Sequence, residues 1–119
     1  MAKLLLKHEG LTLNSFELDK AEYNIGRKSN CDVQLDDPAV SSNHARLVRQ
    51  KNEYLEGHDD FFIEDMGSTN GTLVNDKEVS RQLLKHGDEI QIGNHHFRFD
   101  NEADEADPER TAIYLSDSD

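Results

Sequence analysis

Short apolar or alternating segments recur along this chain at intervals of about ten residues, and Gly, Asn and Asp bound them. Strands bury every second side chain, whereas an amphipathic helix needs apolar residues three to four positions apart, and that spacing is hard to find here. The pattern therefore predicts an all-β fold, an antiparallel sandwich or barrel. The candidate strands are residues 3–7, 11–18, 22–25, 32–35, 45–50, 52–55, 61–65, 72–74, 77–79, 89–92 and 95–99, and Gly93-Asn94 is expected to be the two-residue turn of the last hairpin.

The chain has 119 residues, enough for one domain that buries a core without disulfides or metals. Residues 101–107 are all Asn, Ala or acidic, and Pro108 follows them. Burial cannot offset the ordering entropy of such a stretch. We therefore expect one β-sandwich domain over residues 1–100 and an acidic, disordered tail over residues 101–119.

The formal net charge is −12, and residues 100–119 supply −7 of it, from eight acidic side chains and one arginine. This field repels nucleic acids and anionic membranes, so neither is an expected partner. The leucines of residues 4–6 are too few for a signal peptide or a membrane span. The lone Cys31 has no disulfide partner, and no Cys/His set has the spacing of a zinc site. These features favour a cytoplasmic protein without metal or cofactor, in which Cys31 packs as a small buried group.

Three short runs supply the groups that a phosphate-reading site needs: Gly26-Arg27, Ser41-Ser42-Asn43-His44 and residues 65–72. A phosphorylated side chain carries nearly two negative charges and three acceptor oxygens. The Arg27 guanidinium can bind two of these oxygens, and hydroxyls and the Asn70 amide are neutral donors. Loops at one end of a rigid sandwich can bring such groups together. Each run alone is ordinary turn chemistry, and only their order on a β-rich chain predicts phosphopeptide binding.

The three runs resemble the signatures of the forkhead-associated (FHA) domain, a phosphothreonine-binding module. The resemblance covers residues 11–99, and the motifs that carry it are residues 23–27 with 30–37, 40–46, 65–75 and 87–93. It implies a β-sandwich of about eleven strands in two sheets.

The resemblance also implies roles for individual residues. Arg27 and Ser41 would contact the phosphate, Thr69 would shape the pocket for the phosphate and the threonine methyl, and Asn70 would bind the peptide backbone. Ser42 would also belong to the phosphopeptide-binding residues; many family members have Arg at this position, and the lack of charge on Ser42 bears on affinity. The secondary contacts would be Lys28 and Asn43, and the supporting residues Gly26, His44, Gly67 and Gly71.

The implied function is a non-enzymatic adaptor that docks onto a phosphothreonine-containing protein or peptide after a Ser/Thr kinase has acted. The alternative is a phosphate-independent scaffold or assembly subunit that keeps the fold. Ser41 with His44 invites a hydrolase interpretation, but no Gly-x-Ser-x-Gly elbow is present. His95 and His96 are neighbours on a strand and cannot chelate one metal ion together. We expect one of them to face the core and the other the solvent.

The acidic tail contains one apolar segment, residues 111–115. Tyr114 stands three residues after Thr111, the position at which FHA domains often discriminate among ligands. Thr111 lies 12 residues beyond Phe99, a gap of at most about 40 Å, and tethering makes even a weak ligand effective. Phosphorylated Thr111 is therefore a hypothetical ligand of the protein's own site or of a neighbour's. The alternative is a tail that only adds solubility.

Overall fold

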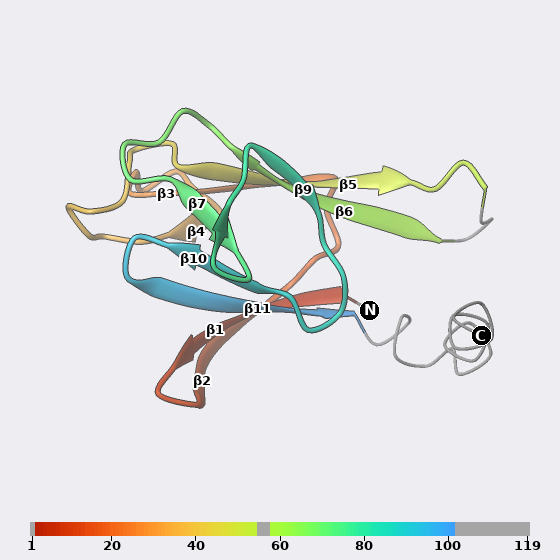
Figure 1. The fold of residues 1–119 in the computed structure, drawn as a ribbon, viewed down its shortest axis with the longest axis horizontal. Helices are drawn as coiled ribbons and strands as arrows, with labels where there is room; N and C mark the ends of the chain where they lie inside the picture. Colours follow the sequence, from red (N-terminus) through yellow and green to blue (C-terminus); the bar gives the residue numbers. More distant parts are fainter. Residues whose placement is uncertain (1, 55–57, 102–119) are drawn as a thin grey trace.

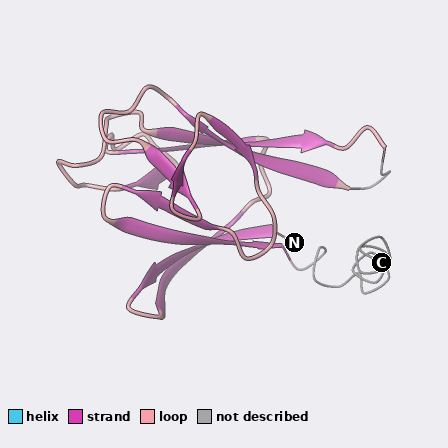
Figure 2. Cartoon of the chain, in the orientation of Figure 1, coloured by secondary structure: helices cyan, strands magenta, loops and turns pink. Residues whose placement is uncertain are grey.

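The structure, a computed structural model, describes residues 2–54 and 58–101. All regular elements in this part of the chain are strands, arranged in two sheets that face each other (Figures 1 and 2). They are β1 (Ala2–His8), β2 (Leu11–Glu17), β3 (Glu22–Gly26), β4 (Val33–Gln34), β5 (Ala45–Lys51), β6 (Asp59–Asp65), β7 (Thr72–Val74), β8 (Lys77–Glu78), β9 (Arg81–Leu83), β10 (Glu89–Ile92) and β11 (His95–Asn101). The six-stranded sheet has the order β2-β1-β11-β10-β7-β8, and the five-stranded sheet β4-β3-β5-β6-β9. The predicted two-sheet, eleven-strand sandwich is confirmed.

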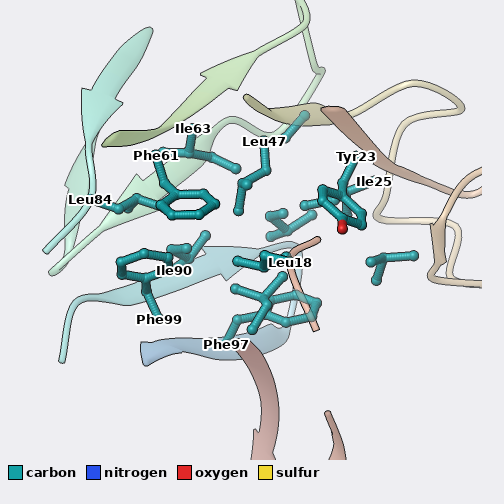
Figure 3. Close-up of a cluster of buried hydrophobic side chains, with 14 of the residues drawn as sticks. Leu18, Tyr23, Ile25, Leu47, Phe61, Ile63, Leu84, Ile90, Phe97 and Phe99 are labelled. Carbon is teal, nitrogen blue, oxygen red and sulfur yellow. The ribbon is translucent and has the colours of Figure 1, made fainter. Parts of the chain in front are cut away.

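The core lies between the sheets because alternate side chains of the central strands, such as β1, β5, β6 and β11, point inward. Leu4, Phe97 and Phe99 come from the six-stranded sheet, and Leu47 and Ile63 from the five-stranded one; all are at most 1% exposed. Figure 3 shows these inner faces meeting, with Phe61 and Phe99 in contact across the sandwich. Their ring centroids are 5.4 Å apart. The alternating pattern in the sequence thus encodes the face of each strand that is buried.

Ten of the predicted strands are observed, with ends that differ by at most two residues. The prediction for residues 52–55 is wrong where the structure describes it, because residues 52–54 form a turn in which the Tyr54 N–H donates to Asn52 Oδ1 at 2.7 Å. Strand β9 was not predicted. The Gly93-Asn94 hairpin turn is confirmed, since Ile92 pairs with His95.

Strand β11 includes Asn101, which pairs with Ala2, so the described part of the sandwich extends one residue past residue 100. The tail expected beyond it, Thr111 included, lies outside the described residues. Among the described residues no helix is long and apolar enough to span a membrane.

Three connections meet at one end of the five-stranded sheet, at the upper left of the sandwich in Figure 1. Strand β3 ends at Gly26, β5 begins at Ala45 and β6 ends at Asp65. Ala45 pairs with both Ile25 and Asp65, so these three strand ends are adjacent. The fold therefore gathers at one end the loops that carry the three sequence runs.

Candidate functional site

The first two loops are joined through their backbones. The Arg27 N–H donates to the Ser41 carbonyl at 3.1 Å, and the Lys28 N–H to the Ser42 carbonyl at 3.4 Å. Cys31 adds a contact, because its Sγ lies 3.6 Å from the same Ser42 carbonyl. The predicted burial of Cys31 is wrong: it is half-buried, because it lies in the connection between β3 and β4 rather than between the sheets. Residues 27–28 therefore run beside residues 41–42.

Gly26 makes this close approach possible. A Cβ at position 26 would lie 2.2 Å from the Ser42 carbonyl oxygen and 2.9 Å from its carbon. Both atoms belong to the backbone, so no rotamer change relieves the overlap. The supporting role expected for Gly26 thus has a steric cause.

We predict that Gly26→Ala loses about 3 kcal/mol of unfolding free energy because the added methyl forces residues 41–42 away from Arg27. Urea unfolding measures this loss, and calorimetry with a phosphopeptide should show weaker binding by the protein that remains folded. Asn24→Ala is the control, since Asn24 is exposed on the same strand. A Gly26→Ala protein as stable as the Asn24→Ala protein would contradict the steric argument.

The third loop is fastened to the second by side-chain hydrogen bonds. The Thr69 N–H donates to Ser41 Oγ at 3.0 Å, and Asn70 Nδ2 donates to the Ala39 carbonyl at 2.8 Å. Thr69 and Asn70 are exposed and Ser41 is half-buried. The Ser41 oxygen keeps its own hydrogen, and the Asn70 amide keeps its acceptor oxygen. Both groups are thus held in place while retaining capacity to bind a ligand.

His44 lies beneath these loops and is fully buried. Its Nδ1 accepts the Ser41 N–H at 3.0 Å, and its Nε2 donates to the Gly71 carbonyl at 2.8 Å. The two bonds assign the neutral ring with hydrogen on Nε2, because a backbone N–H cannot donate to a protonated nitrogen. The His44 backbone also accepts the Met66 N–H at 2.9 Å. A ring so occupied has no free nitrogen to act as a catalytic base toward Ser41.

Asp65 organises the loop that carries Thr69 and Asn70. One carboxylate oxygen accepts the Ser68 and Thr72 hydroxyls, and the other accepts the N–H groups of Gly67 and Ser68, each at 3.1 Å. Ser68 Oγ in turn accepts the Gly71 N–H at 2.9 Å. Burial by itself raises the pKa of Asp65, but the hydrogen bonds from Ser68, Thr72 and the two N–H groups outweigh it and hold that pKa below its ordinary value.

This shift predicts a pH-dependent contribution to stability. Asp65→Asn should lose about 2 kcal/mol of unfolding free energy at pH 7, because charged acceptors make the stronger hydrogen bonds. A carboxyl with a lowered pKa stabilises the fold above the ordinary value of 3.8, and this contribution is lost as the pH falls below that value. The gap between wild type and variant should therefore be constant above about pH 5 and shrink below pH 3.8.

Chemical unfolding at several pH values tests the Asp65 prediction. Asp76→Asn is the matched control, because Asp76 is an exposed turn residue whose positive φ of 69° suits Asn. A gap that persists unchanged into strong acid would mean that Asp65 acts through shape rather than charge.

The cations beside the loops have no partner within residues 2–54 and 58–101. Neither the Arg27 guanidinium nor the Lys28 ammonium makes an ion pair or side-chain hydrogen bond there, and both residues are exposed. Other arginines of the five-stranded sheet are paired: Arg46 and Arg81 both contact Glu64. Two cations at the loop end of an acidic protein thus remain available to an anion.

The structure brings Arg27, Ser41, Thr69 and Asn70 onto three adjoining loops, as the sequence runs predict. Gly67 and Gly71 have φ values of 77° and 85°. Glycine suits these positions because it adopts positive φ without steric cost. Ser42 is half-buried beside Lys28, and Asn43 is exposed.

Sequence reasoning missed Ser68, although an Asp followed by Ser three residues later is a typical hydrogen-bonded turn. The expectation for the histidine pair agrees with the structure, because His95 lies on the same face of β11 as the buried Phe97 and Phe99, and His96 lies on the opposite face. His96 is exposed, and half-buried His95 contacts Asp37 at 3.0 Å. No cluster of three potential metal ligands occurs among the described residues.

Comparison with known proteins adds independent evidence. The family model of the FHA domain matches residues 23–93. The glycogen accumulation regulator GarA of Mycobacterium tuberculosis is 39% identical over 92 residues, which is 77% of this chain and 52% of the relative. The oxoglutarate dehydrogenase inhibitor of Corynebacterium jeikeium is 36% identical over 105 residues, covering 88% of this chain and 68% of the relative. The chain thus spans about half the length of the first of these relatives.

Solved structures have the same fold. One, from a study of phosphothreonine-dependent FHA domain interactions, aligns with a TM-score of 0.69 and 26% identity over 84% of this chain and 95% of its own. Mycobacterium tuberculosis EmbR, solved with a low-affinity phosphopeptide, aligns with a TM-score of 0.69 and 32% identity over 83% of this chain and 24% of its own.

Proposed function

The chain belongs to the FHA domain family, and from this premise we propose that it binds phosphothreonine in a partner protein through the three-loop site. One observation carries the proposal: the Thr69 N–H donates to Ser41 Oγ, which joins two binding loops beside Arg27, whose guanidinium has no partner in the described part of the chain. This arrangement combines a fixed cation with convergent neutral donors, as recognition of a phosphate ester requires.

In the proposed complex the phosphate lies between the Arg27 guanidinium and the Ser41 hydroxyl. The guanidinium binds two phosphate oxygens, and the Ser41 hydroxyl donates to the phosphate while continuing to accept the Thr69 N–H. The Asn70 side chain, already held by the Ala39 carbonyl, presents its amide oxygen to a backbone N–H of the ligand. Little reorganisation is needed, which lowers the entropic cost of binding.

The secondary contacts set affinity more than binding mode. Lys28 adds a second cation at the edge of the site, and Ser42 offers a hydroxyl where an arginine would add a third charge. Three or four hydrogen bonds to a charged group, less the ordering cost of the peptide, correspond to roughly micromolar dissociation constants.

Calorimetry with paired peptides tests the function directly. We expect binding of a phosphothreonine peptide from an oriented library and no measurable binding of the same peptide with unmodified threonine. Equal binding of both forms would overturn the proposal and favour the phosphate-independent scaffold. The same library defines the residues preferred around the phosphothreonine.

The regulatory relatives support a role as a non-enzymatic adaptor. Two of them bear names that describe regulation of glycogen accumulation and inhibition of oxoglutarate dehydrogenase. We infer that this chain likewise docks onto a target protein after a Ser/Thr kinase has acted, in the cytoplasm and without a cofactor.

Phosphorylation of Thr111 is a proposed switch for this site. Strand β11 begins near the site, where His95 contacts Asp37, and runs about 20 Å to Asn101 at the opposite end of the sandwich (Figure 1). Residues 102–111 span at most about 35 Å, which exceeds this distance, so a phosphorylated Thr111 can return to its own site. Binding to a neighbouring molecule competes with this return.

A titration separates these possibilities. Full-length protein phosphorylated at Thr111 should bind an external phosphopeptide more weakly than unmodified protein, with Thr111→Ala treated by the same kinase as the control. Weakening that is independent of protein concentration supports occupancy within one molecule, and weakening that grows with concentration supports a neighbour. Undiminished affinity would dispose of the switch.

A further inference from the structure

The β1–β2 hairpin exposes apolar side chains at a free sheet edge. Strand β2 is the edge of the six-stranded sheet, and Figure 1 shows the hairpin diverging from the facing sheet. Leu11 is 68% exposed and Leu13 61%, the two highest values among the described leucines. Leu13 is the extra residue of a bulge, since Leu6 pairs with Asn14 and Lys7 with Thr12. Strand β2 has no Lys, Arg or Pro, the residues that commonly protect an edge from pairing.

Three cations lie in a row on the outer face of the six-stranded sheet, and the row leads toward the tip of the β1–β2 hairpin. Lys3, Lys7 and Arg98 lie on outward positions, because their neighbours Leu4, Phe97 and Phe99 are buried. None of these three cations forms an ion pair within the described part of the chain, although Lys7 donates to Thr12 Oγ1 at 2.7 Å. Asp100 lies opposite Lys3 on β11 and Glu17 lies opposite it on β2, and neither carboxylate forms an ion pair with Lys3 among the described residues. The hairpin strip, defined as Lys3, Leu5, Lys7, Leu11, Leu13 and Arg98, thus begins with charge and ends with leucines.

Beyond Asn101 the sequence is charged first and apolar afterwards, which is the same order as in the hairpin strip. Asn101 pairs with Ala2, so the tail leaves the sandwich beside Lys3, at the charged start of the strip. Residues 102–109 contain five acidic side chains, and residues 111–115 follow as Thr-Ala-Ile-Tyr-Leu, which favours extended structure. From Ala2 to the hairpin tip is about 20 Å, and residues 102–110 span at most about 30 Å. Acidic residues can therefore lie beside the lysines while residues 111–115 reach Leu11 and Leu13.

We propose that residues 102–115 of the unphosphorylated chain dock in cis along the hairpin strip, with residues 111–115 covering Leu11 and Leu13. The acidic side chains of residues 102–109 pair with Lys3, Lys7 and Arg98. This attraction sets the direction in which the tail runs along the strip. The apolar segment removes the exposed leucines from water and extends the sheet beyond β2. This docking goes beyond phosphothreonine recognition, because it uses neither the three-loop site nor a phosphate.

Amide hydrogen exchange on the full-length, unphosphorylated protein tests the docking. We expect amides of residues 111–115 to exchange about tenfold more slowly than the same sequence in a free peptide. Leu11→Thr with Leu13→Thr should abolish this protection while keeping good strand formers in β2. Leu83→Thr is the matched control, because Leu83 is an exposed strand leucine in the other sheet. Tail amides that exchange at free-peptide rates, or protection that survives the double variant, would overturn the proposal.

Two further measurements distinguish the occupants. Lys3→Gln with Arg98→Gln should reduce the protection about fivefold, whereas Lys77→Gln, an exposed lysine on β8, should leave it unchanged. If Lys77→Gln reduced the protection as much as Lys3→Gln with Arg98→Gln does, the proposed attraction between the acidic residues and these cations would be refuted. Protection that increases with protein concentration would instead assign the strip to a second copy and overturn docking in cis.

Discussion

An Arg27→Ala protein is expected to lose at least about 100-fold in affinity for a phosphothreonine peptide, because a guanidinium that binds two phosphate oxygens supplies two charge-assisted hydrogen bonds. Its fold should persist. The Arg27 N–H that donates to the Ser41 carbonyl belongs to the backbone and survives the substitution. Calorimetry gives the affinity, and urea unfolding gives the stability.

Two further variants make the Arg27 prediction sharp. Arg98→Ala removes another exposed arginine, from β11, and should bind the phosphopeptide as wild type does. Arg27→Lys keeps the charge but loses the planar fork, so its affinity should fall between those of wild type and Arg27→Ala. If Arg27→Ala bound as tightly as Arg98→Ala, the phosphate would have to be held elsewhere.

The sequence predicts most of the fold because strand burial is a local property. Leu47 and Ile63 are buried and their strand neighbours are not, and this alternation is visible without coordinates. Strand β9 lacks the signal because Arg81, Gln82 and Leu83 are all exposed, and it forms through pairing with β6. Because buried and exposed residues do not alternate in β9, a rule based on local sequence would not detect this strand.

The candidate site is predictable in composition but not in its connections. Turn-forming residues indicate where the loops lie, and the resemblance to the FHA domain indicates which loops form the site. The bond from the Thr69 N–H to Ser41 Oγ joins residues 28 positions apart, and only the folded sandwich makes them neighbours. The same reason explains the error at Cys31, whose surroundings are set by Ser42 from a distant segment.

His44→Ala is expected to lose about 4 kcal/mol of unfolding free energy, the largest stability effect among the variants considered. The truncation leaves the Ser41 N–H and the Gly71 carbonyl without their ring partner, and each unsatisfied buried group costs about 1–3 kcal/mol. It also opens a cavity at a position that is 0% exposed. Because Ser41 and Gly71 flank the binding loops, phosphopeptide affinity should fall as well.

His44→Asn separates the two bonds of the ring. The Asn side-chain oxygen can accept the Ser41 N–H in place of Nδ1, but it is too short to reach the Gly71 carbonyl as well. Stability and phosphopeptide affinity should therefore both lie between those of wild type and His44→Ala, with affinity recovering more than stability because Ser41 belongs to the proposed phosphate site. Urea unfolding and calorimetry on the three proteins give this order. Equal affinity of the Asn and Ala variants would show that the Ser41 N–H bond does not position the phosphate-binding hydroxyl.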